Sequence, residues 1–574
     1  MKLHRKAGLV VAVAALAATA VYAIPSANAA SASWNGPAPA VPGAVSGGTL
    51  NILMNGPFEH VDPARNYVGG TLDFYRFFIR TLTQYRTING KTELVPDLAS
   101  DLGTTKDGGK TWVFKLRSGI KYEDGSSVTC ADLKYGIERS YESDILDGGS
   151  TYAAQMLANT NGYKGPYTTP AKDLGSVTCL DGGASIKFNL ANAVPYFPYV
   201  TTFGSFSPIP KAKDTKTKYD QHPISTGPYK IASYDLLKQM TLVRNSNWDP
   251  KTDPLRHNYP DKIVVKFGYE LSALESQFMA DSGDAKTGLS LDAQIVTNLA
   301  TVVGNSKYKN RFFQFQDPYA RYLAINMDTV KDLNVRKAIQ CAIDLKSVLL
   351  AAGGSNAGAY ANSLIPPFVS PAYRNFPICG RDVHKTPAAQ IAAAKALLAK
   401  SPNAKKTLTL AYRDKGVEPQ RAAAAQQALQ AVGFKVTMQK LSKAVYYTAI
   451  GKRGVAGEPD IMQTSWGFDW PAASGIVYAL LDGRTMSKEN AESNYSRANV
   501  PAIQTLFAQA DKTVSTPAQE KLLGDIEQKL IQDYAAVMPT FIETSNFLAG
   551  SKVGGLQADG GYGTFSPINA YIKK

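Results

Sequence analysis

The chain has 574 residues, of which 44% are hydrophobic and 10% aromatic, so it is long enough for two or more lobes with their own cores. Its formal net charge is +15, but the 62 Lys and Arg residues are spread along the chain without a dense run. This pattern argues against a nucleic-acid-binding protein and favours solubility and attraction to anionic envelope polymers.

The first 29 residues have the pattern of a secretory signal peptide. Lys2, Arg5 and Lys6 give a basic start, small apolar residues fill 7–21, and Ala27-Asn28-Ala29 matches an A-x-A cleavage site. No second run of 18 apolar residues follows, which predicts no membrane span. We therefore expect an exported protein, extracellular or in the cell envelope, and no lipid anchor because no Cys lies near the cleavage site.

Short strands and helices are predicted to alternate after residues 30–48, whose Ala, Pro, Ser and Gly content predicts a flexible tether. The spacing of apolar residues predicts strands at 49–54, 111–116, 185–190, 229–233, 239–244 and 262–269. Helices are predicted at 71–82 and at 131–141, with Thr129 as the cap of the second one.

The second half of the chain continues the alternation. Strands are predicted at 321–326, 407–412, 434–440 and 460–464, helices at 335–350, 387–398, 419–431 and 521–534, and extended chain at 562–572. Residues 407–440 form a β-α-β unit, with Gly433 ending its helix. The predicted fold class is therefore α/β, with mixed sheets covered by helices in at least two lobes.

Signatures of catalysis are missing from the sequence. His60, His222, His257 and His384 are not next to a nucleophile motif, and Gly353-Gly-Ser-Asn-Ala357 lacks the last glycine of a nucleophile elbow. The Walker A, GxGxxG and HExxH patterns do not occur either. We expect no enzymatic activity and no cofactor.

Four cysteines occur in the chain, at Cys130, Cys179, Cys341 and Cys379. An exported protein favours disulfides, but four cysteines allow three connectivities, and the spacing does not select one. A metal site is the alternative, and it is disfavoured because no CxxC or HxxxH spacing occurs.

Six stretches in a fixed order carry a resemblance to a known family. They are HVDPA (60–64), LVPDLASDL (94–102), DGGKTWVFKLRSGIKYEDGSSVTCADLKYGIERS (107–140), STGPYKI (225–231), YLAINMDTVKDLNVRKAIQCAID (322–344) and SWGFDWPAA (465–473). Together they resemble the family 5 extracellular solute-binding proteins, the peptide/nickel group that supplies ABC importers. The resemblance covers the chain from Thr49 to its end.

The resemblance implies a two-lobed, periplasmic-binding-protein-like α/β fold with an extra small subdomain and a hinged cleft. On that basis lobe I is 49–316 with the small subdomain at about 73–210, lobe II is 317–543, and 544–574 returns to lobe I. The hinge is expected near 315–320 and 543–546. Each lobe then contains two cysteines, so Cys130–Cys179 and Cys341–Cys379 are the expected disulfides.

The function implied by the resemblance is capture of short peptides between the lobes and their delivery to an ABC permease and ATPase complex. The protein is expected to be a monomer that binds no nucleic acid and meets the membrane only through the transporter. Two alternatives stay open. In the first, a protein of the same fold binds an oligosaccharide or a metal chelate instead of a peptide. In the second, the chain is a secreted hydrolase.

Asp469 has two competing interpretations. By its position alone it is a good N-cap for a helix from Trp470 to Leu481, because Pro471 follows at the start. The resemblance, through the W-x-x-D spacing of Trp466 and Asp469, implies instead that the carboxylate binds the α-ammonium of a peptide. Peptide-binding members often continue with a second acid before a proline, and this chain lacks that acid.

Further binding residues are expected around Asp469 and at the hinge. Trp466, Phe468 and Trp470 line the pocket or, in part, pack in the core. The resemblance implies that 67–70 runs along the cleft, so Tyr67 is a candidate, and Gly69 and Gly70 permit close approach of the backbone. Tyr319, Tyr322 and Asn326 border the expected hinge, although Asn326 is equally suited to a structural role.

Overall fold

The computed structural model describes residues 36–88, 91–159, 161–369, 371–379, 387–442, 445–513, 515–559 and 561–574. The predicted signal peptide, the start of the tether and His384 lie outside these ranges. Among the helices in the described ranges, none is both long and apolar enough to span a membrane. The backbone of 38–47 is hydrogen-bonded to residues 253 and 259, at N–O distances of 2.9 and 2.8 Å, so this part of the expected tether is bound rather than free.

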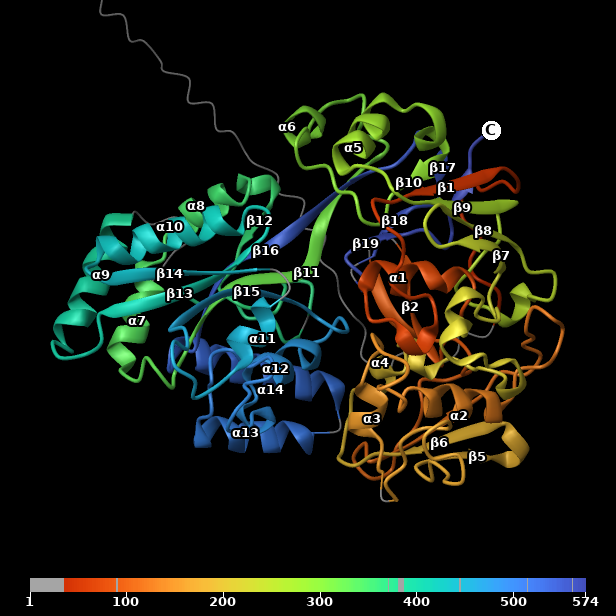
Figure 1. Ribbon diagram of the computed structural model, residues 1–574, viewed down its shortest axis with the longest axis horizontal. Coiled ribbons are helices and arrows are strands. Elements are labelled where there is room, and N and C mark those ends of the chain that lie inside the picture. The colour runs from red at the N-terminus through yellow and green to blue at the C-terminus, as the bar shows by residue number, and fades with distance from the viewer. Residues whose placement is uncertain are drawn as a thin grey trace, which may run out of the picture.

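One body of the molecule is built on a five-stranded sheet in the order β10-β1-β9-β8-β7 (Figure 1). Its strands are β1 (Thr49–Leu53), β7 (Tyr229–Asp235), β8 (Gln239–Arg244), β9 (Lys262–Lys266) and β10 (Gly288–Leu289). Strand β1 pairs in parallel with β9 and β10, and β7, β8 and β9 form an antiparallel meander. The strands β1, β7, β8 and β9 are those predicted from the sequence, because each carries alternating or β-branched residues.

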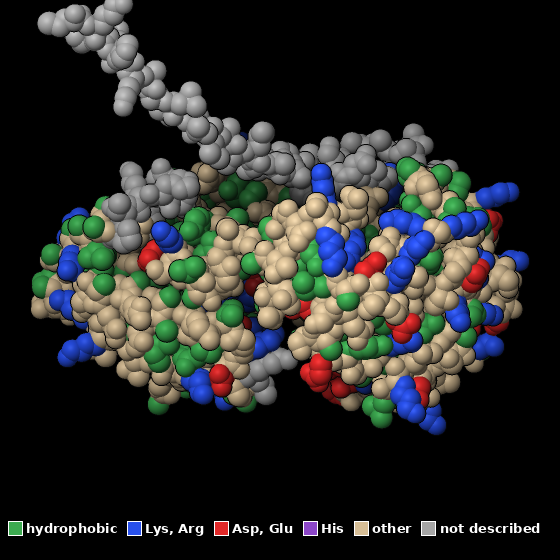
Figure 2. All heavy atoms as spheres, turned by 90° about the horizontal axis from the view of Figure 1, so that it is seen from above, with side chains coloured by type: hydrophobic (Ala, Val, Ile, Leu, Met, Phe, Trp, Pro, Cys, Tyr) green, Lys and Arg blue, Asp and Glu red, His purple; other side chains and the backbone are tan. Residues whose placement is uncertain are grey.

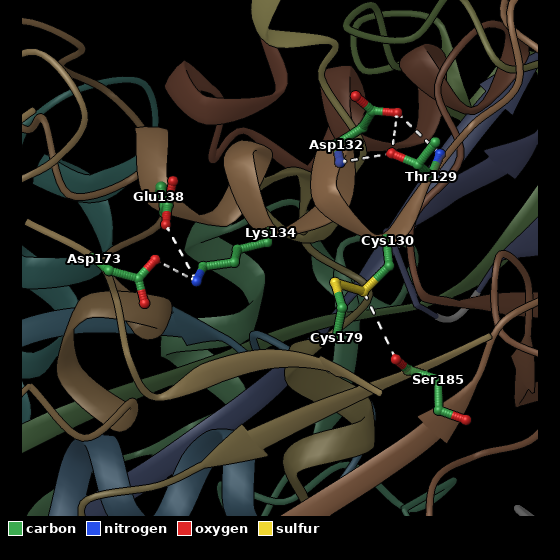
Figure 3. The surroundings of a disulfide bond; sticks show 8 residues. All are labelled: Thr129, Cys130, Asp132, Lys134, Glu138, Asp173, Cys179 and Ser185. Carbon is green, nitrogen blue, oxygen red and sulfur yellow. Dashed lines mark hydrogen bonds and ion pairs between the residues drawn. A yellow bond between two sulfur atoms is a disulfide. The ribbon is translucent and has the colours of Figure 1, made fainter. Parts of the chain in front are cut away.

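A smaller unit with a three-stranded sheet, β4-β6-β5, lies against this body (Figure 1). Its elements, with the adjoining hairpin, are β2 (Thr83–Ile88), β3 (Lys91–Pro96), β4 (Thr111–Lys115), α2 (Cys130–Arg139), α3 (Tyr152–Met156), β5 (Val177–Leu180), β6 (Ser185–Asn189) and α4 (Phe197–Val200). Thr129 and Asp132 form a reciprocal capping box at the start of α2, as Figure 3 shows, so the predicted cap is confirmed. Next to it the Cys130–Cys179 disulfide joins α2 to β5 (Figure 3).

The second body is a six-stranded sheet in the order β12-β16-β11-β15-β13-β14. Its strands are β11 (Phe312–Ile325), β12 (Gly358–Tyr360), β13 (Thr407–Asp414), β14 (Lys435–Ser442), β15 (Ile461–Gly467) and β16 (Val537–Leu548). Its helices are α7 (Leu333–Ala342), α8 (Leu345–Ala351), α9 (Pro387–Ala399), α10 (Glu418–Ala431), α11 (Tyr446–Gly451), α12 (Ser474–Leu481), α13 (Pro501–Asp511) and α14 (Thr516–Gln532). The predicted β-α-β unit is β13, α10 and β14, with the two strands parallel. The disulfide Cys341–Cys379 lies in this body, so both expected pairs are present.

Two long antiparallel strands, β11 and β16, connect the bodies (Figure 1). Their register shifts between Gln316 and Ala320, where the expected hinge lies. The hydrophobic core of the second body, the larger of the two, is made of residues within 320–542. The core of the first body is made almost entirely of residues within 50–315 and 547–570. Figure 2 shows two masses with a notch between them. The exact lobe limits at 316/317 and 543/544 stay a prediction.

The remaining described elements are short or lie at the edge of the first body. They are α1 (Gly69–Phe74), α5 (Leu271–Ala280), α6 (Leu299–Val302), β17 (Val553–Gly554), β18 (Gln557–Asp559), β19 (Thr564–Ser566) and β20 (Tyr571–Ile572). Strands β19 and β20 lie in the segment 562–572 that was predicted to be extended, and they pair with β18 and β17, which precede it.

Two of the predicted helices differ in the structure: one is shorter than predicted, and the other is divided into two helices. The helix expected at 71–82 ends at Phe74 with one 3-10 turn after it, because the Phe78 carbonyl accepts hydrogen bonds from Thr226 and Gly227 instead of continuing the helix. The helix expected at 335–350 is α7 and α8, because Ile343 has an extended backbone and the Asp344 side chain caps the second helix.

Candidate functional site

A cavity of about 300 Å³ lies where the two bodies face each other, next to the β11 hinge segment. Its volume is at the lower end of the range of small-ligand sites. It is lined by Tyr67, Gly69, Leu72, Tyr85, Thr202, Phe203, Pro318, Tyr319, Tyr447, Ser465, Trp466, Gly467, Phe468, Asp469, Tyr495, Gly561 and Tyr562. Tyr67, Gly69, Trp466 and Phe468, all expected from the W-x-x-D stretch and the segment after HVDPA, therefore line one cavity together with Asp469.

Asp469 lies just beyond the end of β15 and is half-buried. The predicted capping role is wrong, because α12 begins only at Ser474, and the Glu520 carboxylate accepts hydrogen bonds from the Ala473 and Ser474 amides, at 2.5 and 3.3 Å. The carboxylate of Asp469 is therefore not used to start a helix.

The Asp469 carboxylate accepts hydrogen bonds from two tyrosines of the first body. The Tyr67 hydroxyl donates to Oδ1 and the Tyr152 hydroxyl to Oδ2. Since an ionised carboxylate has about four lone-pair positions, two acceptor positions stay open. The arrangement is an oriented anion at the junction of the two bodies, with room for a cationic donor.

Burial raises the pKa of Asp469 from its usual value to about 6, although the two phenol hydrogen bonds lower it. The pKa values of Tyr67 and Tyr152 are raised far above the usual range by burial and by the nearby carboxylate. Both phenols are therefore neutral donors at neutral pH, while Asp469 is ionised there and loses its charge in mildly acidic solution.

The loop that carries Tyr67 is fixed by the HVDPA motif. The Asp62 carboxylate accepts from the Ala64 amide at 2.9 Å and makes a two-point ion pair with Arg139 of α2, at 2.9 and 2.8 Å. Asn66 accepts from the Val68 amide and donates to the His60 carbonyl, both at 2.9 Å. Hydrogen bonds on both sides of Tyr67 therefore set the direction in which its side chain points.

The three aromatic residues of the SWGFDW stretch have different roles. Trp466 is half-buried in the cavity wall, and its indole donates to the Gly475 carbonyl at 3.1 Å. Phe468 also lines the cavity, with its other side against Phe368 at a centroid distance of 5.8 Å.

Trp470 is not among the lining residues of this cavity, so its predicted ligand contact stays a prediction. It is 2% exposed and packs across the junction against Tyr152 and Tyr196, with centroid distances of 5.3 Å to each. It therefore joins the two bodies rather than touching the ligand space.

Three more expected residues lie away from the cavity lining. Tyr322 is 1% exposed and belongs to the core of the second body, because it alternates with Tyr319 and Arg321 along β11. Asn326 is fully buried, and its amide donates to Glu458 and to the Pro459 carbonyl, at 2.9 and 3.0 Å. Gly70 lies inside α1, whereas Gly69 at its start is in the lining. Tyr322, Asn326 and Gly70 are therefore not part of this cavity's lining, and binding roles for them stay predictions.

Sequence reasoning missed most of the tyrosines at the site. Tyr85, Tyr447, Tyr495 and Tyr562 line the cavity from four separate parts of the chain, and Tyr152 bonds to Asp469 from outside the lining. The high tyrosine content was the only available signal, and it does not indicate which of the 30 residues are involved.

The Tyr152 hydroxyl is expected to position Asp469 rather than to touch the ligand. Tyr152→Phe keeps the ring contacts with Phe203 and Trp470 but removes one donor that lowers the pKa of Asp469. We expect the affinity for an amine ligand to fall by about 3- to 10-fold at pH 7, less than the full worth of a hydrogen bond to a charged group because Tyr67 still donates to the carboxylate. The variant should also lose affinity at a higher pH than the wild type does as the solution is acidified. Titration calorimetry from pH 5 to 8 measures this pH dependence. If the pH at which affinity falls were the same in the variant and the wild type, this role would be contradicted.

Within the described ranges, no group of three or more His, Cys, Asp or Glu residues is arranged to hold a metal ion. The cavity lining offers one carboxylate, phenol and indole groups, and backbone atoms. This chemistry suits hydrogen bonding and contact with a cation or an apolar group.

Comparison with known proteins gives a match over most of the chain. The model for "Bacterial extracellular solute-binding proteins, family 5 Middle" matches residues 93–488. The oligopeptide-binding protein OppA of Bacillus subtilis (strain 168) is 28% identical over 225 residues, which are 38% of this chain and 39% of that protein. The periplasmic oligopeptide-binding protein OppA of Escherichia coli (strain K12) is 23% identical over 484 residues, 81% of this chain and 82% of that protein.

The solved structures include a close match to the whole fold. The clavulanic acid biosynthesis oligopeptide binding protein 2 superposes with a TM-score of 0.85 at 25% identity, over 96% of this chain and 100% of that one. The two-lobed α/β architecture predicted from the sequence is confirmed by this likeness.

Proposed function

Because the chain belongs to the family 5 extracellular solute-binding proteins, we propose that it is the substrate-binding component of an ABC importer and captures short peptides between its lobes. The relatives of B. subtilis and E. coli are oligopeptide-binding proteins by name, and the second aligns over four fifths of both chains. The captured peptide passes to a membrane permease that an ATPase drives. Lobe I is 49–316 with 544–574, and lobe II is 317–543, in this proposal.

The observation that carries the choice of peptide is the Asp469 carboxylate in the cavity wall. A peptide's α-ammonium supplies the cationic donor for the open acceptor positions of Asp469, while Tyr67 and Tyr152 stay bonded to it. Aromatic rings alone would suit a sugar as well, but a neutral sugar has no cation to pair with the Asp469 carboxylate. We therefore favour a peptide over the oligosaccharide, and capture without chemistry over hydrolysis.

The proposal includes how the protein reaches its place of action. The signal-peptide pattern of residues 1–29 supports export to the cell envelope or the extracellular space. The monomer proposed here meets the membrane through its transporter.

The direct experiment is to identify what the protein captures. The mature chain is purified, its bound ligands are exchanged, and the protein is offered a pool of dipeptides to pentapeptides followed by mass spectrometry of the retained fraction. Retention of a subset of peptides is expected. Retention of oligosaccharides from a parallel pool, or cleavage of the peptides, would contradict the proposal.

The affinity for a cationic ligand is expected to depend on pH through Asp469. Because the raised pKa of about 6 means that the carboxylate gains a proton as pH falls, affinity should be highest near pH 7, between this pKa and the pKa of about 8 at which the α-ammonium of the peptide loses its proton. It should then decrease about tenfold per unit below pH 6, since only the ionised fraction binds. Calorimetry over pH 4.5–8 measures this, with Asp469→Asn as the control that should show no acidic limb. An equally large loss of affinity in acid in the variant would mean that a group other than Asp469 causes it.

A further inference from the structure

One loop of the second body reaches into the hydrophobic core of the first. Trp470 and Ala472, which follow β15 in the chain, are 2% and 3% exposed and pack among the core residues of the first body. The other described members of that core lie within 50–315 and 547–570. These two side chains are therefore the contribution of the second body to the core of the first.

The Trp470 ring is held by two tyrosines of the first body. It stacks on Tyr196, which directly precedes α4, with a centroid distance of 5.3 Å and an angle of 21° between the rings. It meets Tyr152 of α3 nearly edge-on, also at 5.3 Å. Tyr196 packs in addition against Tyr478 of α12, at 5.7 Å, where Figure 1 shows α12 opposite α3 and α4. We call Tyr152 and Tyr196 the aromatic socket.

The loop that carries Trp470 is bound just as firmly to the second body. The Trp470 indole donates to Ser474 Oγ at 2.9 Å, so the ring is tied to the first residue of α12. The Glu520 carboxylate of α14 accepts hydrogen bonds from the amides of Ala473 and Ser474. Since the loop is fixed to α12 and α14, separating the two bodies at this junction must withdraw the Trp470 ring from the aromatic socket.

The ring contacts of this junction do not use the cavity. The four rings lie outside the cavity lining, although Phe468 and Asp469, next to Trp470 in the chain, are part of it. The contacts are made between side chains of the protein, so they need no ligand as a partner. Because an aromatic side chain removes a large apolar area from water when it is buried, we expect the docked position of Trp470 to be favoured by a factor of about a hundred.

We infer that Trp470 in the aromatic socket is a latch, which holds the two bodies together whether the cavity is filled or empty. A ligand then binds to a protein whose bodies are already closed for most of the time, so less of its binding energy is used to bring them together. The effect on peptide affinity rests on the proposed function. The closed state without a ligand does not, because it depends on contacts within the protein alone.

The first test needs no knowledge of the ligand. Small-angle X-ray scattering is recorded on the mature wild type, freed of bound ligands, and on Trp470→Ala, Tyr196→Ala and Trp470→Phe. The wild type should have the same radius of gyration with and without an added tripeptide pool. Both alanine variants should have a larger radius without peptide, and Trp470→Phe, which keeps a ring in the aromatic socket, should be close to the wild type. A wild type as extended as the alanine variants would overturn the inference.

Peptide affinity gives the second test. Because the latch acts on the closing of the bodies and not on the amine, Trp470→Ala should weaken the binding of free and N-acetylated tripeptides by the same factor, about tenfold. The loss should lie mainly in faster dissociation, which surface plasmon resonance measures, and Trp470→Phe should recover most of it. A loss confined to the free peptides would mean that Trp470 acts through Tyr152 and Asp469, and the latch would be wrong.

The two tests separate this inference from the proposed function. If no peptide binds, the proposed function fails, while the scattering of the ligand-free proteins still decides whether the latch exists. A wild type that is extended without peptide and compact with it would overturn the latch and leave peptide capture standing.

Discussion

Replacing Asp469 with alanine is expected to lower peptide affinity by at least about thirtyfold at pH 7.5. Truncating one partner of a buried, hydrogen-bonded charge pair costs about 2–5 kcal/mol, which corresponds to this factor at its lower limit. The variant also leaves the Tyr67 and Tyr152 hydroxyls without their acceptor, which adds to the loss. Titration calorimetry with a tripeptide that binds the wild type measures the change.

The matched controls isolate the charge. Asp469→Asn keeps the shape and the acceptor oxygen but not the charge, so it should lose nearly as much affinity for free peptides as alanine. For N-acetylated peptides both variants should resemble the wild type. Asp173→Asn removes a carboxylate whose side chain is 69% exposed and should leave binding unchanged. Equal losses for free and acetylated peptides would mean that Asp469 supports the cavity structurally rather than binding an amine.

The second large effect is expected on stability. Asp62→Ala removes the partner of Arg139, whose side chain is fully buried and which also contacts Asp214 at 3.2 Å. Leaving a buried guanidinium without its two-point partner should lower the free energy of unfolding by about 3–5 kcal/mol, toward the lower value because Asp214 remains. Urea unfolding followed by intrinsic fluorescence measures the difference.

The HVDPA motif gives this prediction a functional consequence. Because Asp62 holds the turn that leads to Tyr67, the folded fraction of the variant should also bind peptide more weakly. Asp173→Ala, which breaks the exposed contact with Lys134, serves as the control and should leave the unfolding midpoint unchanged. An Asp62→Ala protein with wild-type stability would show that Asp214 alone neutralises Arg139.

The sequence predicted correctly those helix caps and strands that depend on residues close together in the chain. The capping box of α2 follows from Thr129 and Asp132 three residues apart, and the strands β1, β8 and β9 follow from alternating or β-branched residues. The helix at 71–82 could not be predicted correctly, because the carbonyl of Phe78 bonds to amides nearly 150 residues away. Such contacts override the local preference.

Asp469 could be predicted as a residue of the candidate site from the sequence, whereas most of the residues around it could not. The W-x-x-D spacing identified Asp469 and Trp466, but the helix after them starts at Ser474, since Glu520, 46 residues further on, binds its first amides. Tyr152 lies 317 residues before Asp469, and no local pattern marks it. Tyr322 does not line the cavity because β11 alternates sides, so its neighbours Tyr319 and Arg321 are near the cavity while Tyr322 is in the core.

The most direct measurement is a crystal structure of the protein with a bound tripeptide. The account predicts the terminal nitrogen of the peptide within hydrogen-bond distance of an Asp469 carboxylate oxygen, with Tyr67 and Tyr152 still donating to the same carboxylate. A peptide whose terminal nitrogen lies elsewhere, with Asp469 bonded to the two tyrosines alone, would contradict it.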